Sequence, residues 1–149
     1  MINDKKPLEH RYTISEVAAD FHMQPSTLRY YEDIGLLTDV ERTPSGKRFY
    51  RDKHIHRLRT ICCFKNAGMT IAQLQRFFRC EKDEDAHIYE IMELLLDQKK
   101  QLETQMRRLE QARAHLERKL AYYSDVQKAI ESDLPRPDWA DYRCDDTRR

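Results

Sequence analysis

An apolar residue occupies every seventh position in the C-terminal half of the chain, and this repeat limits the possible folds more than any other feature of the sequence. Seven positions follow this repeat without a break: Ile88, Leu95, Leu102, Leu109, Leu116, Tyr123 and Ile130. No glycine or proline occurs from residue 69 to residue 134, so nothing interrupts a helix there. A sustained seven-residue repeat is typical of a coiled coil, whose helices bury the repeat against a partner helix. A helix over residues 85–130 would be roughly 70 Å long and could not bury its stripe alone, so we expect a homodimer.

The composition favours helices and excludes several classes of protein. Charged residues make up 36% of the 149 residues and only three are glycines, which argues against sandwiches, barrels and Gly-rich nucleotide folds. The longest apolar runs have four residues, far short of the about 20 that cross a bilayer, so we expect no membrane partner. The four cysteines show no CxxC spacing and the N-terminus has no apolar signal-peptide core. We therefore expect a cytoplasmic protein.

The first half of the chain predicts a helix-turn-helix followed by a hairpin. Residues 13–16 form a capping box that opens one short helix. Pro25 suits the first position of a second helix, which would end at Gly35. Turn residues at 43–46 separate two short segments and predict a β-hairpin. A basic hairpin that follows a helix-turn-helix is typical of a wing.

Two more helices are predicted before the long one. Asp52 is the expected N-cap of a helix that runs to about Ala67, and Thr70 with Gln73 forms a second capping box. We therefore expect a mainly α protein in four parts. These are a flexible N-terminal arm at 1–11, a winged helix-turn-helix domain with two further helices at 12–82, a dimerisation helix at 84–131 and a polar tail at 132–149. Whether the tail, which holds Trp139, packs on the dimer or hangs free stays open.

The net charge of +1 hides an uneven distribution of charge. Residues 1–79 hold 14 Lys and Arg against 9 Asp and Glu, whereas residues 80–149 hold 13 against 17. Seven basic residues lie between Val40 and Thr60: Arg42, Lys47, Arg48, Arg51, Lys53, Arg57 and Arg59. A basic cluster on an otherwise neutral chain indicates a polyanion as partner, although a solvated helix face would also account for it.

Three segments of the chain resemble the N-terminal domain of MerR-family transcription regulators. They read YTISEVA at residues 12–18, STLRYYEDIGLL at 26–37 and RTPSGKRFY at 42–50. The stretch at 67–74 also fits, and the helix with the seven-residue repeat resembles the antiparallel dimerisation helix of the family. The wing departs from the family pattern Arg-x-Tyr-Arg, which is loosened here to residues 47–51.

The resemblance implies a transcription regulator rather than an enzyme, with no cofactor. Regulators of this family bind promoter DNA as dimers on a palindrome and distort it for RNA polymerase. In this fold the second helix enters the major groove and the wing contacts the flanking backbone. The expected DNA contacts are Thr13, Ser26, Thr27, Arg29, Tyr30, Tyr31, Arg42, Lys47, Arg48 and Tyr50. For Tyr30 and Tyr31 a place in the core is the alternative.

The signal that the protein senses is predicted from its cysteines. A short-tailed branch of the family responds to aldehydes or electrophiles through a cysteine late in the third helix, which is the position of Cys63. Helical spacing places Cys62 at the edge of the core stripe and Cys63 on its flank. Four nearby groups could lower the pKa of Cys63: His54, His56, Arg59 and Lys65. An inert interface residue is the alternative interpretation of Cys63.

Other sensors and other classes of protein fit the sequence less well. Metal sensors of the family place a cysteine near the position of Ala86 and two more in a later loop. Here only Cys144 follows the long helix, so we predict no metal site, although Cys80 and His87 could contribute ligands. A small organic ligand could instead be lined by Phe78, Tyr89 or Tyr123.

A coiled-coil adaptor that does not bind DNA is the main alternative of another class. The basic hairpin beside a Tyr-Tyr helix argues against it. No catalytic motif favours an enzyme. The operator, the target genes, the inducer and the direction of regulation stay open.

Overall fold

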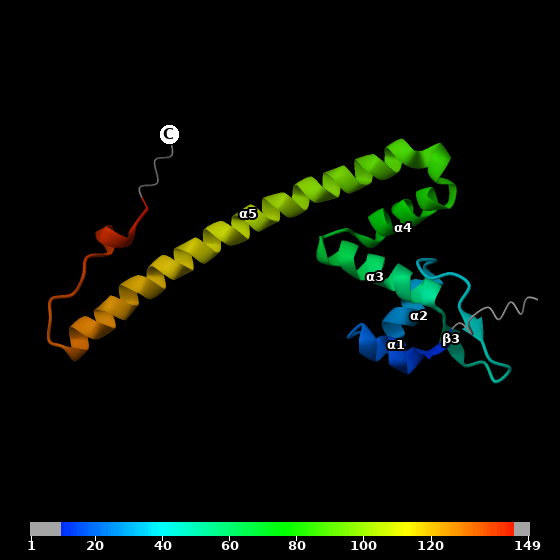
Figure 1. The fold of residues 1–149 in the computed structure, drawn as a ribbon, viewed down its shortest axis with the longest axis horizontal. Coiled ribbons are helices and arrows are strands. Elements are labelled where there is room, and N and C mark those ends of the chain that lie inside the picture. The colour runs from blue at the N-terminus through cyan, green and yellow to red at the C-terminus, as the bar shows by residue number, and fades with distance from the viewer. Residues whose placement is uncertain (1–9, 145–149) are drawn as a thin grey trace, which may run out of the picture. The chain divides into compact units, whose positions relative to one another are not determined.

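The chain is mainly helical, as its composition predicts (Figure 1). The computed structural model describes residues 10–144, so most of the predicted arm and the last five residues of the tail lie outside the described residues. The described chain divides into two units: unit 1 ends at Lys99 and unit 2 begins at Lys100. None of the helices in this part of the chain has an apolar stretch long enough to cross a bilayer.

The helix-turn-helix of unit 1 consists of α1 (Ile14–Asp20) and α2 (Pro25–Asp33). The predicted capping box at the start of α1 is confirmed. The Thr13 N–H donates to Glu16 Oε2 at 2.7 Å, and the Glu16 N–H donates to Thr13 Oγ1 at 3.2 Å. Pro25 is the first residue of α2, and Gly35 follows its C-cap at φ +78°, a conformation that glycine adopts without strain.

The wing is the predicted hairpin with an added third strand. β2 (Glu41–Arg42) and β3 (Arg48–Tyr50) pair antiparallel, with Arg42 opposite Arg48. Gly46, at φ +82°, closes the turn by donating its N–H to the Thr43 carbonyl at 2.8 Å. The sequence did not predict β1 (Tyr12–Thr13), which pairs with β3 on its other side. Two residues are too few to show the alternation that marks a strand.

Helices α3 (Asp52–Asn66) and α4 (Ile71–Cys80) follow the sheet. The predicted N-cap of α3 is wrong by one residue, because the cap is Arg51, whose N–H donates to His54 Nδ1 at 2.8 Å. The predicted capping box of Thr70 and Gln73 is confirmed, with the Gln73 N–H donating to Thr70 Oγ1 at 3.2 Å.

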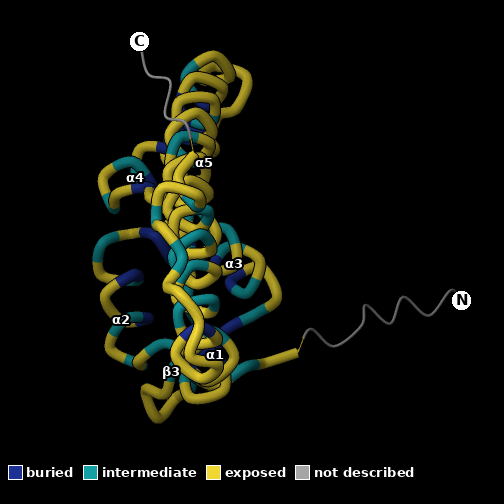
Figure 2. Tube along the Cα trace, turned by 90° about the vertical axis from the view of Figure 1, so that its left-hand side faces the viewer, coloured by how far each residue is buried: buried dark blue, intermediate teal, exposed yellow. Residues whose placement is uncertain are grey.

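The core of unit 1 lies between these helices and the first turns of α5 (Glu84–Glu131). Figure 2 shows buried positions on α2, α3 and α4. The side chains with no exposed surface are large: Val17, Leu28, Leu36, Tyr50, Leu58, Ile61 and Leu74. From α5, Ile91 and Leu94 join this core, and Gln98 Nε2 donates to the Ala67 carbonyl at 2.5 Å. These contacts explain why unit 1 extends into α5.

Unit 2 contains the rest of α5 and the described part of the tail, which packs back on the helix. Asp133 turns the chain at φ +50°, and the Leu134 N–H donates to the Ala129 carbonyl at 2.8 Å. The short 3-10 helix η2 (Trp139–Tyr142) then lies against α5, where the Tyr142 hydroxyl donates to Asp125 Oδ2 at 2.7 Å. The tail therefore covers one face of α5 in unit 2.

Candidate nucleic-acid interface

Helix α2 presents a polar face that carries most of its predicted DNA contacts. Ser26, Arg29 and Tyr30 are exposed and Thr27 is half-buried. The side chain of Tyr31 is only 5% exposed and packs in the core, where burial raises its pKa. Tyr31 follows Leu28 by three residues and so shares its buried face. Its predicted role as a DNA contact is wrong, and Tyr30 is the tyrosine that faces solvent.

Tyr50 is the second correction to the predicted contacts. Its side chain is fully buried, and its ring lies edge-on to the ring of His54 with 5.8 Å between centroids. Burial raises the pKa of the Tyr50 hydroxyl. The strand β3 turns Tyr50 towards α3, so the hydroxyl cannot reach a phosphate from this position.

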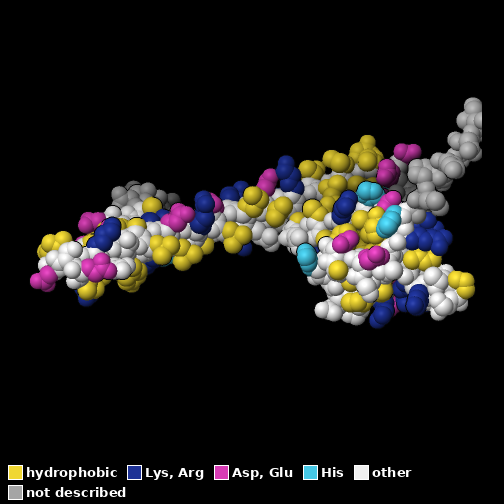
Figure 3. All heavy atoms as spheres, turned by 60° about the horizontal axis from the view of Figure 1, so that its bottom comes forward, with side chains coloured by type: hydrophobic (Ala, Val, Ile, Leu, Met, Phe, Trp, Pro, Cys, Tyr) yellow, Lys and Arg dark blue, Asp and Glu magenta, His cyan; other side chains and the backbone are white. Residues whose placement is uncertain are grey.

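A cleft beside α2 brings four of the predicted contacts together. It has a volume of about 470 Å³ and is lined by the start of α1, by α2 and by the wing. Thr13, Arg29, Lys47 and Arg48 all line it. Figure 3 shows several Lys and Arg side chains close together on this unit. Residues far apart in the sequence thus form one basic surface, as a polyanion site requires.

Glu32, which sequence reasoning missed, connects α2 to the wing. Its carboxylate accepts from Arg48 Nε at 2.6 Å and from Arg42 Nη2 at 3.3 Å. The bond to Glu32 raises the pKa of Arg48. Arg48 is half-buried, whereas Arg42 and Lys47 are exposed. Arg48 therefore holds the wing against α2 through the shorter bond, and Arg42 adds a longer one from an exposed position. An acid on a helix that faces a basic hairpin is the pattern that could have predicted this pair.

Comparison with known proteins identifies the family. Residues 12–80 match the model described as MerR HTH family regulatory protein, and residues 55–119 match the model described as MerR, DNA binding. A helix-turn-helix transcriptional regulator of Haemophilus influenzae is 35% identical over 116 residues, which cover 78% of this chain and 86% of that protein.

The chain belongs to the MerR family of DNA-binding transcriptional regulators.

Two solved MerR-family structures have the same fold. HiNmlR, a MerR-family regulator that lacks the sensor domain and was crystallised bound to promoter DNA, is 31% identical with a TM-score of 0.74. The match covers 87% of this chain and all of HiNmlR. A MerR-family regulator from Bacillus thuringiensis is 28% identical with a TM-score of 0.65, over 75% of this chain and 98% of the other.

The cysteines of this MerR-family chain differ in exposure. Cys63 on α3 is exposed, Cys62 is half-buried, and Cys80 at the end of α4 is buried. Burial raises the pKa of Cys62. His54 is not available to act on Cys63, because it is buried and both of its ring nitrogens are hydrogen-bonded. Nδ1 accepts from Arg51, so Nε2 is the protonated nitrogen that donates to the Thr38 carbonyl at 3.0 Å.

The three residues suggested for an organic-ligand site differ in their exposure to solvent. Phe78 is buried in unit 1 beneath the Arg57 guanidinium, which lies 4.1 Å from the ring centroid. Tyr89 is 89% exposed. Tyr123 belongs to unit 2 and is 60% exposed. Neither tyrosine is enclosed as a binding-site residue would be.

Proposed function

We propose that this MerR-family regulator binds a palindromic promoter site as a homodimer and switches transcription by distorting the DNA. In this proposal RNA polymerase is its partner at the promoter, and a reactive electrophile that modifies Cys63 is the effector. The observation that supports the proposal is that one chain has both an exposed basic face, in unit 1, and an exposed apolar stripe, in unit 2.

The apolar stripe supports the homodimer. In unit 2 four of the five residues of the seven-residue repeat are largely exposed, and the fifth, Leu102, is half-buried. The exposed four are Leu109 at 71%, Leu116 at 63%, Tyr123 at 60% and Ile130 at 61%. Hydrophobic side chains recur along α5 in Figure 3. A stripe with this period fits a second copy of the same helix, which in an antiparallel pair would cover both stripes at once.

The basic face supports binding to DNA through both the groove and the backbone. Arg29 and Tyr30 are exposed on α2, and Arg42 and Lys47 are exposed on the wing. Arginine can donate to guanine edges, whereas cations on the wing neutralise phosphates. Each phosphate that is neutralised contributes about 0.9 to the slope of affinity against salt concentration.

Cys63 lies where a modification could act on the α3–α5 contact within unit 1. Its carbonyl accepts from the Ala67 N–H at 3.0 Å, and the Ala67 carbonyl accepts from Gln98 at 2.5 Å. With an aldehyde, the Cys63 thiolate sulfur would bond to the carbonyl carbon, and the oxygen would take up a proton to give a hemithioacetal. The added group would lie one helical turn from the Gln98 contact.

The test combines DNA selection with transcription in vitro. We expect the full-length protein to enrich palindromic duplexes from a random pool. Lys47→Ala should lower the salt slope by about 0.9 for each chain in the complex. Cys63→Ser should keep its affinity for DNA and lose the response of transcription to formaldehyde, whereas Cys144→Ser, another exposed cysteine, should keep both. A Cys63→Ser protein that responds like the unmodified chain would exclude Cys63 as the sensor. Salt-independent binding would favour the adaptor.

A further inference from the structure

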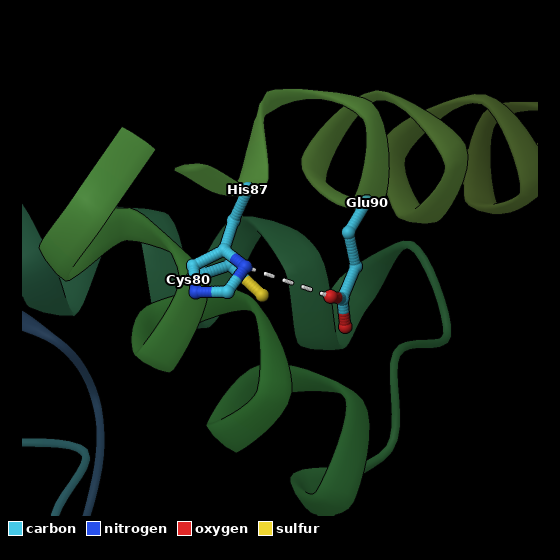
Figure 4. Close-up of side chains that lie close together, drawn as sticks. All are labelled: Cys80, His87 and Glu90. Carbon is cyan, nitrogen blue, oxygen red and sulfur yellow. Dashed lines mark ion pairs between the residues drawn. The ribbon is translucent and has the colours of Figure 1, made fainter. Parts of the chain in front are cut away.

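Three metal-binding side chains meet where α4 passes into α5, away from the basic face. Cys80 is the last residue of α4, and His87 and Glu90 lie in the first turns of α5 (Figure 4). The Cys80 sulfur, a ring nitrogen of His87 and a carboxylate oxygen of Glu90 all lie within 4.8 Å of one another. All three residues belong to unit 1.

The local structure explains why they meet. The short 3-10 helix η1 (Glu81–Asp83) reverses the chain between the two helices, so the end of α4 lies beside the start of α5. His87 and Glu90 are three residues apart and therefore share one face of α5. Cys80 is 5% exposed, Glu90 is half-buried and His87 is exposed. One ligand is therefore held in the core, and His87 lies on the side from which an ion would enter.

Arg76 orients the carboxylate of this cluster. Its Nε donates to Glu90 Oε1 at 2.5 Å, while the other oxygen, Oε2, lies 3.9 Å from His87 Nδ1. One oxygen is thus held by a partner on α4, and the other faces the imidazole. The Cys80 thiol is also hydrogen-bonded to this carboxylate. Metal-binding carboxylates are commonly fixed in this way by a second hydrogen bond.

We propose that Cys80, His87 and Glu90 bind one Zn²⁺ ion, or a transition-metal ion of similar chemistry, in each chain. A thiolate, an imidazole and a carboxylate are the donor types that Zn²⁺ accepts, whereas Mg²⁺ and Ca²⁺ prefer oxygen alone. Ligands of a tetrahedral zinc ion lie about 3.5 Å apart, so small side-chain rotations would bring these donors into place. Water would complete the tetrahedron.

The site does not involve Cys63, and its ligands differ from those that the family resemblance implied. The first of those implied ligands falls near Ala86, which carries no ligand atom on its side chain. The new cluster instead depends on Glu90, which no sequence pattern singled out. Binding would join the end of α4 to the start of α5 and so stabilise the folded form of unit 1.

Metal titration of the full-length protein tests this proposal. Co²⁺ replaces Zn²⁺ in such sites, and its bond to a thiolate gives a charge-transfer band in the near ultraviolet. We expect one Co²⁺ per chain with this band, and no band in Cys80→Ser. By calorimetry, His87→Gln and Glu90→Gln should each weaken Zn²⁺ binding at least about tenfold. Zn²⁺ should raise the Tm of the unmodified chain and should raise that of His87→Gln much less.

Two matched variants separate this site from other ligands. Cys63→Ser removes an exposed cysteine and Glu93→Gln neutralises an exposed acid on α5, and both should bind Zn²⁺ as the unmodified chain does. The proposal is wrong if His87→Gln and Glu90→Gln keep full affinity, or if the thiolate band disappears in Cys63→Ser and persists in Cys80→Ser. Should Cys80→Ser fail to fold, His87→Gln still decides, because its side chain is exposed.

Discussion

Units 1 and 2 use the same apolar residue types in opposite ways. In unit 1, Leu28, Leu36 and Leu58 have no exposed surface. In unit 2, Leu109, Leu116 and Leu120 are 63% to 71% exposed. Unit 1 thus has a buried core within one chain and exposes apolar side chains mainly on its part of α5, such as Leu96 at 57%. Unit 2 leaves most of its apolar stripe exposed, which costs free energy in water. The core of unit 1 is therefore stabilised by contacts within one chain, whereas the apolar surface of unit 2 suits a contact with a second copy, as we propose.

Within unit 2, the tail contacts one face of α5 and not the face that carries the repeat. Lys119, Tyr122 and Asp125 contact the described tail residues. The exposed repeat, by contrast, runs through Leu116 and Tyr123 on a neighbouring face of the same helix. The chain covers one face of α5 with its own tail and leaves the face with the seven-residue repeat bare.

The largest effect on stability is expected from a cavity in the core of unit 1. Leu58→Ala should lower the free energy of unfolding by about 2–5 kcal/mol, because it removes a fully buried side chain from a packed core. Urea unfolding followed by circular dichroism measures this loss. Leu96→Ala is the matched control, because Leu96 is 57% exposed on α5 in the same unit. Equal losses in the two variants would contradict the assignment of the core.

The next effect is expected in unit 2 and concerns association. Leu116→Asp should weaken the dimer at least about 100-fold, since a charge would replace an apolar contact in both copies. Sedimentation equilibrium measures the dissociation constant. Ala121→Asp places the same charge on an exposed position off the stripe and should leave the dimer nearly unchanged. If both variants remain equally dimeric, the stripe is not the interface.

The parts of the fold that follow from short local patterns could be predicted from the sequence. Thr13 with Glu16, Thr70 with Gln73 and the turn at Gly46 each depend on residues within four positions of one another. Such patterns act through the backbone next to them and need no knowledge of the tertiary structure. The long helix was also predictable, because its apolar residues recur with a regular period in the sequence.

The contacts that depend on tertiary packing could not be predicted in this way. Tyr30 and Tyr31 are neighbours of the same type, and only the packing of α2 decides which one is buried. Glu32 meets Arg48 across 16 positions, and Glu90 meets Cys80 through the turn at η1. The periodicity of α5 likewise marks an apolar stripe without saying which face the tail would cover.

A change of pH should distinguish the two units. Burial lowers the pKa of His54 in unit 1 below 6.5, so the unfolded chain binds a proton at a pH where the folded chain does not. The contribution of the neutral, buried His54 to stability is therefore fully present above about pH 6.5 and is lost as the pH drops towards the lowered pKa. In unit 2, hydrogen bonds from Lys128 and Tyr142 lower the pKa of Asp125 below 3.8, so that contact persists to lower pH.

Unfolding at about pH 7.5 and about pH 5.5 measures this difference. Circular dichroism should show a lower urea midpoint at the more acidic pH, and His54→Gln should show a smaller change between the two. The urea midpoint followed by the fluorescence of Trp139, the only tryptophan of the chain, reports on the tail and should change little between these pH values. A His54→Gln protein with the full pH dependence would show that another group is responsible.

The smallest effect is expected from the tail, and it separates the two faces of α5. Lys119 Nζ lies 3.7 Å from the ring centroid of Trp139, and the ring of Trp139 stacks on that of Tyr142 with 6.3 Å between centroids. Trp139→Ala should cost about 1 kcal/mol or less, because these contacts are near the surface, and hydrogen exchange at residues 139–142 should become faster. The dissociation constant of the dimer should change less than about twofold, since the tail and the apolar stripe lie on different faces. A loss of dimer comparable with that of Leu116→Asp would instead place the tail in the interface, and the stripe alone would no longer account for association.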